Sequence, residues 1–389
     1  MSETSPGVDR AVLVGFDFGQ NGFAESLEEL RLLALSAGIK PVVMITGKRA
    51  RPDPALYGGK GKTEEIRAAA IANDANLVLY NHQLSPAQER NLNTTLGARV
   101  VDRTALILDI FGQRAKSRAG KLQVELAQLE HASTRLVRSW THLERQRGGH
   151  GMMGGMGETQ LEIDRRLIGK RVKLLKDELV KLERQRSVQR RARARGGVFS
   201  ASLVGYTNAG KSTLFNALTH ADSYAADQLF ATLDTTSRRL YLEGVGQIVM
   251  SDTVGFIREL PHTLIDAFRA TLEETIRADV LVHVVDSASP SRADQVAEVN
   301  AVLSEIGTDD VPQILVWNKI DASGLDPGFD RDEYGKISRV RLSARTGVGV
   351  ELLRRALIEA ASGRNPSSDH EASQASMGLE TGRVDVRPE

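Results

Sequence analysis

The alternation of apolar and polar positions divides this 389-residue chain into two regions of strands and helices, joined by a long helical segment. In the first region, apolar runs typical of buried strands lie at residues 12–16, 41–45 and 76–80, and a helical pattern lies at residues 27–37. Ser85, Pro86 and Gln88 have the spacing of a capping box with proline in the first turn, which predicts the start of another helix. We therefore expect a small α/β domain over residues 11–112, after a disordered start at residues 1–10.

The middle segment carries two heptad series, in which mostly apolar residues recur at alternating spacings of four and three. The first series is Leu122, Leu126, Leu129, Ser133, Leu136, Trp140 and Leu143, and the second is Ile168, Val172, Leu175, Leu179 and Leu182. Two helices with facing series and a short connection predict an antiparallel coiled-coil hairpin over residues 113–196. The connecting residues 148–157 contain six glycines and three methionines, which predicts a flexible tip.

Positive charge is concentrated in this hairpin segment. Residues 114–195 hold 21 Lys and Arg against 9 Asp and Glu, a net of +12, whereas the whole chain has a formal net charge of +1. Arg145, Arg147, Arg165 and Arg166 border the glycine-rich tip. A basic segment inside an otherwise acidic chain favours contact with nucleic acid. The alternative is a solvated coiled-coil face with a glycine linker.

The second region begins with a phosphate-binding pattern. Residues 198–204 predict a short buried strand and residues 213–218 a helix, with Gly-Tyr-Thr-Asn-Ala-Gly-Lys-Ser at positions 205–212 between them. A glycine-rich turn in this context aims backbone N–H groups and the positive end of the helix dipole at phosphate oxygens. Lys211 would place a positive charge on the β- and γ-phosphates, and Ser212 would supply a hydroxyl ligand for Mg²⁺.

A second pattern indicates that the nucleotide is GTP rather than ATP. The sequence Asn-Lys-Ile-Asp at 318–321 follows an expected strand at residues 313–317. The Asp321 carboxylate can only accept hydrogen bonds, which suits the N1–H and 2-amino donors of guanine and not adenine. Ser343, Ala344 and Arg345 follow another expected strand and would complete the base pocket through a backbone N–H to guanine O6.

Two further segments complete a Ras-like GTPase domain over residues 197–362. Residues 252–255 end an expected strand, which would place Asp252 near the metal and the Gly255 N–H near the γ-phosphate. Residues 230–236 form an irregular, hydroxyl-rich stretch, in which one threonine should ligate Mg²⁺ only while the γ-phosphate is present. Phe256 stands where many GTPases have a glutamine that orients the attacking water, so we expect slow intrinsic hydrolysis and a switch role.

Composition restricts the remaining possibilities. The absence of cysteine excludes disulfides and thiolate sites, and the eight histidines lack ligand spacing, so structural zinc is not expected. No apolar run approaches a membrane span, and the first residues lack a signal-peptide core. We expect a cytoplasmic monomer without an integral membrane segment, and peripheral membrane association stays open.

Over residues 11–362 the chain resembles the HflX family of GTPases. The segments that carry the resemblance are residues 57–65, 81–92, 102–111, 121–129, 154–162 and 228–234. The resemblance implies binding to the large ribosomal subunit and its RNA, insertion of the glycine-rich tip near the peptidyl transferase centre, and separation of stalled ribosomes into subunits. It also implies GTP hydrolysis stimulated by the large subunit, with release of the factor, and it assigns the switch metal ligand to Thr232.

Motifs and resemblance together predict one site for GTP or GDP and Mg²⁺. Its catalytic residues would be Lys211, Thr232 and Gly255, and its metal ligands Ser212 and Thr232. The nucleotide-binding residues would be Gly205, Tyr206, Thr207, Asn208, Ala209, Gly210, Lys211, Ser212, Thr213, Phe230, Ala231, Thr232, Leu233, Asp234, Asp252, Thr253, Val254, Gly255, Asn318, Lys319, Ile320, Asp321, Ser343, Ala344 and Arg345.

The sequence also raises points that its motifs do not decide. Residues 58–62 lie between a strand and an expected helix start at Thr63, so they could bind phosphate of RNA or ATP, or form a structural turn. His82 is expected to pack or cap rather than catalyse. Thr235 replaces the family's usual proline. Residues 363–389 form a polar tail that we expect to be disordered, at a place where many members carry a small folded domain. Alternative functions are an ATP-assisted RNA remodelling protein and a ribosome-assembly checkpoint.

Overall fold

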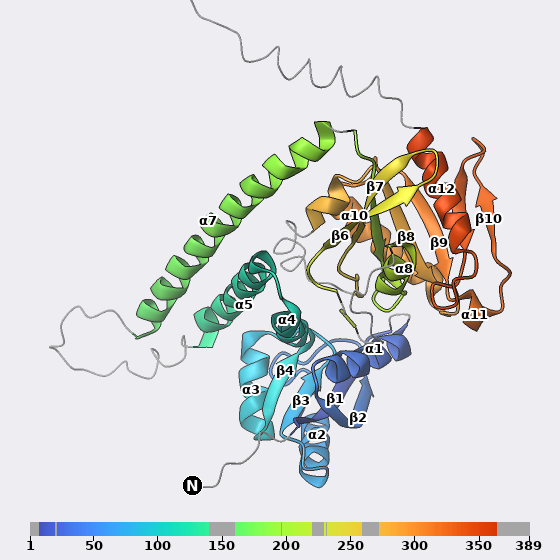
Figure 1. The fold of residues 1–389 in the computed structure, drawn as a ribbon. Coiled ribbons are helices and arrows are strands. Elements are labelled where there is room, and N and C mark those ends of the chain that lie inside the picture. The colour runs from blue at the N-terminus through green and yellow to red at the C-terminus, as the bar shows by residue number, and fades with distance from the viewer. Residues whose placement is uncertain are drawn as a thin grey trace, which may run out of the picture.

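The computed structural model describes residues 8–19, 22–139, 160–195, 197–219, 229–230, 232–258 and 272–363. The N-terminal domain (Figure 1) consists of β1 (Arg10–Asp17), α1 (Phe23–Ser36), β2 (Lys40–Lys48), α2 (Lys60–Ala72), β3 (Leu77–Tyr80), α3 (Pro86–Leu96), β4 (Arg99–Asp102) and α4 (Arg103–Arg114). Its parallel sheet has the order β2-β1-β3-β4. Apolar residues of α1 and α4 pack on one face and those of α2 and α3 on the other, which confirms the predicted small α/β domain.

The helix starts of this domain follow local chemistry. At α3, the Ser85 hydroxyl accepts a hydrogen bond from the Gln88 N–H, and the Gln88 side chain accepts one from the Ser85 N–H. The predicted capping box is therefore confirmed. The predicted start of α2 at Thr63 is wrong, because this helix begins at Lys60 after Gly59, whose φ of 77° suits glycine. His82 accepts a hydrogen bond from the Phe16 N–H at 3.1 Å.

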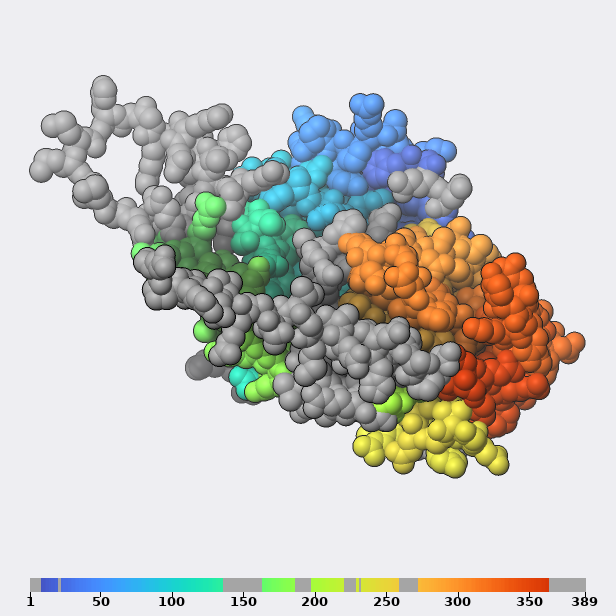
Figure 2. Space-filling model, turned by 90° about the horizontal axis from the view of Figure 1, so that it is seen from above, coloured from blue at the N-terminus to red at the C-terminus, as the bar shows by residue number. Residues whose placement is uncertain are grey.

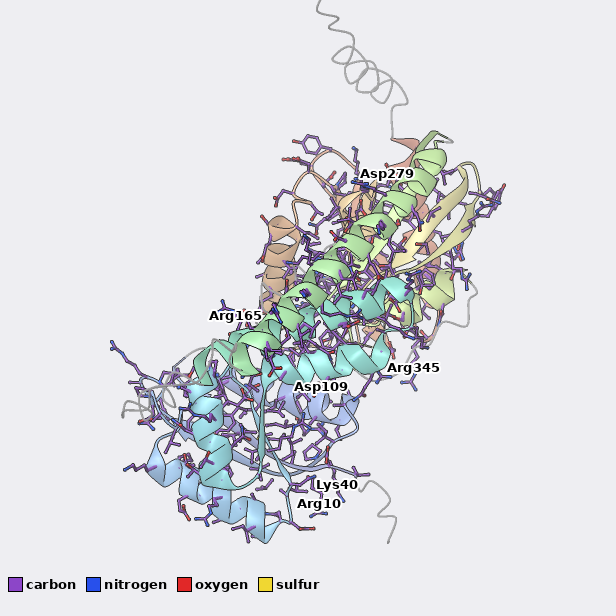
Figure 3. The ribbon with its side chains drawn as sticks, turned by 90° about the vertical axis from the view of Figure 1, so that its left-hand side faces the viewer. Arg10, Lys40, Asp109, Arg165, Asp279 and Arg345 are labelled. Atoms are coloured by element: carbon purple, nitrogen blue, oxygen red, sulfur yellow. The ribbon has the colours of Figure 1, made fainter. Side chains whose placement is uncertain are left out.

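The middle segment forms two long helices, α5 (Arg118–Ser139) and α7 (Gln160–Arg195), which run antiparallel (Figure 1). They pack through residues of the two heptad series, with Leu126, Leu175 and Leu179 buried and Leu122, Leu129 and Val172 beside them. Ion pairs from Arg171 to Glu125 at 2.6 Å and from Lys176 to Glu130 at 2.8 Å join the same helices. The tip at residues 148–157 lies outside the described residues, as do Arg145 and Arg147. Exposed Arg165 lies near one end of α7, and Asp279 of the next domain lies toward the other (Figure 3).

The C-terminal domain consists of β5 (Ser200–Gly205), α8 (Lys211–Thr219), β6 (Thr236–Leu242), β7 (Gly246–Asp252), β8 (Val280–Asp286), α10 (Arg292–Glu305), β9 (Gln313–Asn318), α11 (Ile320–Ser323), β10 (Gly328–Arg331), β11 (Ile337–Arg341) and α12 (Val350–Ser362). The sheet order is β10-β11-β9-β8-β5-β7-β6, and only the two edge strands, β10 and β6, pair antiparallel. This arrangement agrees with the predicted Ras-like domain. Thr236, expected in an irregular stretch, instead begins β6.

One apolar cluster extends across both sheet domains, and each domain also has a cluster of its own. Val282 and Val284 of β8 face a cluster with α8 and α12, whereas the preceding Leu281 faces a cluster that also contains Leu13 and Leu33 of the N-terminal domain. Seen from above, the N-terminal domain (blue) lies against the orange part of the C-terminal domain (Figure 2). Within the described residues, no helix has the length and apolar character needed to cross a bilayer.

The buried histidine of β8 predicts a pH-dependent stability. His283 is 1% exposed, and burial lowers its pKa from 6.5 to about 4. Below pH 6.5 the unfolded chain binds a proton that the folded chain does not, so the free energy of unfolding should fall by up to about 3 kcal/mol between pH 6.5 and pH 4. Denaturant unfolding at several pH values would measure this loss, which His283→Gln should abolish. An unchanged pH profile in this variant would contradict the assignment.

Candidate nucleotide-binding site

The phosphate-binding turn joins the carboxyl end of β5 to α8. Gly205 has a φ of 144°, and a Cβ at this position would lie 2.2 Å from the Val284 carbonyl oxygen. Gly210 has a φ of 94°, and a Cβ there would lie 2.2 Å from Asn318 Nδ2. Both positions therefore need glycine, because a side chain would collide with the neighbouring strand or with the 318–321 segment.

Lys211 lies inside this turn. Its Nζ donates hydrogen bonds to the carbonyl oxygens of Gly205 at 3.0 Å and Tyr206 at 2.8 Å. Burial lowers the pKa of Lys211 to about 8, and the nearby Asp252 charge opposes that shift. A Cβ at Gly255 would lie 2.9 Å from Lys211 Nζ, so glycine at this position keeps space open beside the ammonium group. Such a group can neutralise developing charge on a phosphate.

Two hydroxyls and one carboxylate meet beside the turn. Asp252 Oδ2 accepts hydrogen bonds from Ser212 Oγ at 2.7 Å and Thr232 Oγ1 at 2.9 Å, and the two hydroxyl oxygens are 2.8 Å apart. The other carboxylate oxygen, Asp252 Oδ1, is buried with no hydrogen-bond partner among the described residues. Burial also raises the pKa of Asp252. An oxygen-only cluster with a buried carboxylate fits Mg²⁺, which Ser212, Thr232 and Asp252 would hold and which would supply positive charge to stabilise phosphate oxygens.

The predicted base-reading segments lie together. Asn318 Nδ2 donates to the Ala209 carbonyl at 2.8 Å, and Asn318 Oδ1 accepts from the Ala344 N–H at 2.9 Å. Asn318 thus joins the phosphate-binding turn to the 343–345 segment. Lys319 Nζ forms a 2.8 Å ion pair with Asp286, and Asp321 is exposed. Asp321 therefore offers a solvent-accessible carboxylate close to the point where Asn318 joins the phosphate-binding turn to the 343–345 segment. Arg345 is also exposed and lies on the C-terminal domain (Figure 3).

Three residues predicted to bind nucleotide have side chains that contact other parts of the protein. Phe230 and Leu233 are buried in the core shared by the two domains. The Asp234 carboxylate accepts hydrogen bonds from the N–H groups of Lys116 and Ser117. Ala231 lies outside the described residues. In the described part of this loop, Thr232 is the residue whose side chain contacts Ser212 and Asp252.

The tyrosine of the phosphate-binding turn has a role that the sequence did not reveal. Its hydroxyl donates to Glu29 at 2.6 Å and accepts from the Arg258 N–H at 2.7 Å. Burial and the Glu29 charge raise the pKa of Tyr206 above its usual range. Glu29 also binds Arg103 of the N-terminal domain. Tyr206 therefore connects the turn to the segment after Gly255 and to the N-terminal domain.

Phe256 belongs to the core rather than to the solvent-facing site. Its side chain is 1% exposed, and its backbone bonds Gly205 and Thr207 at 3.1 and 2.7 Å. A phenyl ring offers no hydrogen bond to an attacking water, so Phe256 itself contributes packing beside the turn.

The comparison with protein families covers most of the chain. Residues 24–112 match the model described as GTP-binding GTPase N-terminal, residues 114–193 match GTP-binding GTPase Middle Region, and residues 200–319 match 50S ribosome-binding GTPase. GTPase HflX of Escherichia coli strain K12 is 53% identical over 356 residues, which is 91% of this chain and 83% of that protein. The chain belongs to the HflX family of GTPases.

Other relatives agree with this assignment. GTPase HflX of Magnetococcus marinus is 47% identical over 91% of this chain and 82% of its own length. Among solved structures, that of SsGBP in complex with GDP has a TM-score of 0.51 and 25% identity, covering 91% of this chain and 99% of that one. Membership of the HflX family supports GTP binding and hydrolysis by this chain.

Proposed function

We propose that this HflX-family GTPase binds the large ribosomal subunit and its RNA and dissociates stalled ribosomes into subunits. The observation that carries the proposal is the attachment of a basic, antiparallel helical hairpin to a GTPase-type site in one chain, with 53% identity to E. coli GTPase HflX across both. The family model over residues 200–319 is described as a 50S ribosome-binding GTPase. GTP is the substrate and Mg²⁺ the cofactor in this proposal.

Hydrolysis by the free protein is slow in this proposal and is stimulated by the ribosome. Phe256 supports the slow rate, because it is buried and cannot orient water. Lys211 and the Gly255 N–H would face the phosphates, and Ser212 and Thr232 would ligate Mg²⁺. Asp321 and a backbone N–H of the 343–345 segment would recognise guanine, with Asn318 holding their two segments together.

Sucrose-gradient sedimentation tests the ribosomal activity directly. Vacant ribosomes incubated with GTP-loaded protein should separate into subunits, and the same protein loaded with GDP should leave them associated. Ribosomes that stay intact with GTP-loaded protein would exclude splitting. Preferential binding to precursor particles would instead support the assembly checkpoint.

The two hydroxyls that meet at Asp252 should differ in their nucleotide dependence. Ser212→Ala should lower Mg²⁺-dependent affinity for GDP and for a non-hydrolysable GTP analogue alike, by about tenfold. Thr232→Ala should lower the affinity for the analogue by a similar factor and leave GDP binding nearly unchanged, because the switch loop releases with the γ-phosphate. Titration of fluorescent nucleotides measures both. Equal losses for both nucleotides in Thr232→Ala would contradict a switch role.

A further inference from the structure

The loop that carries Thr232 is fastened on its N-terminal side to the N-terminal domain. The Phe230 ring packs edge-on against Phe111 of α4, with ring centroids 4.6 Å apart, and is 2% exposed. The Leu229 N–H donates to Ser36 Oγ of α1 at 3.1 Å. Phe230 has a φ of 55°, a left-handed conformation that costs about 1 kcal/mol or more for a residue with a Cβ. The packing on α4 must offset that strain.

On its C-terminal side the same loop is fastened to the base of the hairpin. Asp234 Oδ2 accepts hydrogen bonds from the Lys116 N–H at 2.8 Å and the Ser117 N–H at 2.7 Å, and Asp234 Oδ1 accepts one from the Ser117 hydroxyl. These donors immediately precede α5, so the carboxylate stabilises the positive end of that helix. A Cβ at Gly120 of α5 would lie 2.2 Å from Asp234 Oδ1, so helix and carboxylate are closely fitted.

Thr232 lies two residues from each attachment. A short segment with both ends held has little conformational freedom left to lose, so the hydroxyl reaches Ser212 and Asp252 at a small entropic cost. The partners that hold the loop lie outside the C-terminal domain. Phe111 and Ser36 belong to the N-terminal domain, and Ser117 lies at the start of the hairpin. A change in the orientation of α5 would therefore displace the Asp234 end of the loop.

We propose that Asp234 is a positioning residue that couples the helical hairpin to the Thr232 contact in the nucleotide site. The inference rests on the proposed role of Thr232 as a ligand required for the GTP-bound state. The coupling is reciprocal: a hairpin held in this orientation favours GTP, and bound GTP favours this orientation of the hairpin. A partner that binds the hairpin thereby acts on the nucleotide site through Ser117 and Asp234.

Two substitutions test this coupling from opposite sides. Asp234→Asn removes the negative charge from the start of α5 and leaves one oxygen acceptor, so an N–H₂ group replaces Oδ1 beside the Ser117 hydroxyl and Gly120. Gly120→Ala inserts a methyl group against the Asp234 carboxylate without changing any residue of the C-terminal domain, and alanine favours the helix. Gly169→Ala in α7 is the matched control, because a Cβ there meets nothing within 4 Å. The affinities of the full-length protein for GDP and for a non-hydrolysable GTP analogue are measured by fluorescence titration.

Asp234→Asn and Gly120→Ala should each lower the affinity for the GTP analogue roughly tenfold, a typical size for coupling between sites. The affinity of both variants for GDP should stay within about twofold of the wild type, and this retained binding would show that they fold. The control Gly169→Ala should change neither the affinity for GDP nor that for the GTP analogue. Adding Asp234→Asn to Thr232→Ala should cause no further loss, since the effect passes through Thr232.

Three results would overturn the coupling. Wild-type affinity for the GTP analogue in both Asp234→Asn and Gly120→Ala, with a loss in Thr232→Ala, would leave the proposed site intact and remove the positioning role. Equal losses for GDP and the analogue would indicate general damage to the domain. An unchanged affinity in Thr232→Ala would reject the switch ligand itself, and the coupling with it.

Discussion

Replacing Asp321 with asparagine should lower the affinity for GTP about a hundredfold and raise the affinity for xanthosine triphosphate. The carboxylate accepts from two guanine donors, and each hydrogen bond to a charged group contributes about 1.5–3 kcal/mol. Asparagine keeps one acceptor and turns an N–H₂ group toward the guanine amino group, so about 3 kcal/mol should be lost, equivalent to about a hundredfold. Xanthine carries a carbonyl at that position, which accepts from the new amide.

The matched control for this change is Asp326→Asn. Asp326 is also an exposed aspartate and lies five residues further along the same segment, so its substitution removes the same charge at a position with no predicted base contact. Competition binding with GTP, ATP and xanthosine triphosphate would compare the three proteins. Unchanged GTP affinity in Asp321→Asn would reject Asp321 as the reader of guanine.

Deleting residues 148–157 and closing the hairpin should abolish ribosome splitting and leave intrinsic GTP hydrolysis within about twofold of the wild type. The residues proposed to act in hydrolysis lie in the C-terminal domain, whereas the deleted segment lies between α5 and α7 in the sequence. The shortened hairpin would no longer extend its tip into ribosomal RNA. Sucrose gradients measure splitting, and phosphate release without ribosomes measures the intrinsic rate. Normal splitting by the shortened protein would mean that the hairpin is only a spacer.

Charge reversal at the four arginines that border this tip separates electrostatics from length. Substituting Arg145, Arg147, Arg165 and Arg166 with glutamate keeps the connection intact but removes positive charge. Binding to ribosomes should weaken, and its dependence on salt should flatten by roughly 0.7–0.9 in log–log slope for each phosphate that the protein no longer neutralises. A salt slope equal to that of the wild type would show that these arginines do not bind phosphates.

Much of the fold and site could be predicted because the relevant signals are local. The phosphate-binding turn occupies eight consecutive residues between a strand and a helix, and Gly205 and Gly210 within it have positive φ values that suit glycine. The capping box at Ser85 spans four residues. The heptad spacing of α5 and α7 depends only on the helical repeat, so the sequence itself indicates the seam in which Leu126 and Leu175 are buried.

Contacts between segments far apart in sequence could not be predicted in the same way. The sequence places Tyr206 in the phosphate-binding turn, but it does not show that the tyrosine hydroxyl donates a hydrogen bond to Glu29, 177 positions away. Asp234 stood in a stretch assigned to the nucleotide, yet its carboxylate binds Ser117, 117 positions away. Isolated tyrosine and aspartate side chains carry no periodicity or spacing that would identify such partners.

From the order of its residues alone, this chain specifies a nucleotide chemistry, because hydroxyl, ammonium and carboxylate groups at short spacings suit phosphate, Mg²⁺ and guanine whatever surrounds them. The tertiary packing of α4, the start of α5 and the loop that carries Thr232 decides how the nucleotide site is joined to the rest of the protein. Only when α4 and the start of α5 lie beside the loop do Phe230 and Asp234 become its two attachments. The physical reason is that hydrogen bonding and burial depend on distance in space, which the sequence does not state for residues more than a hundred positions apart.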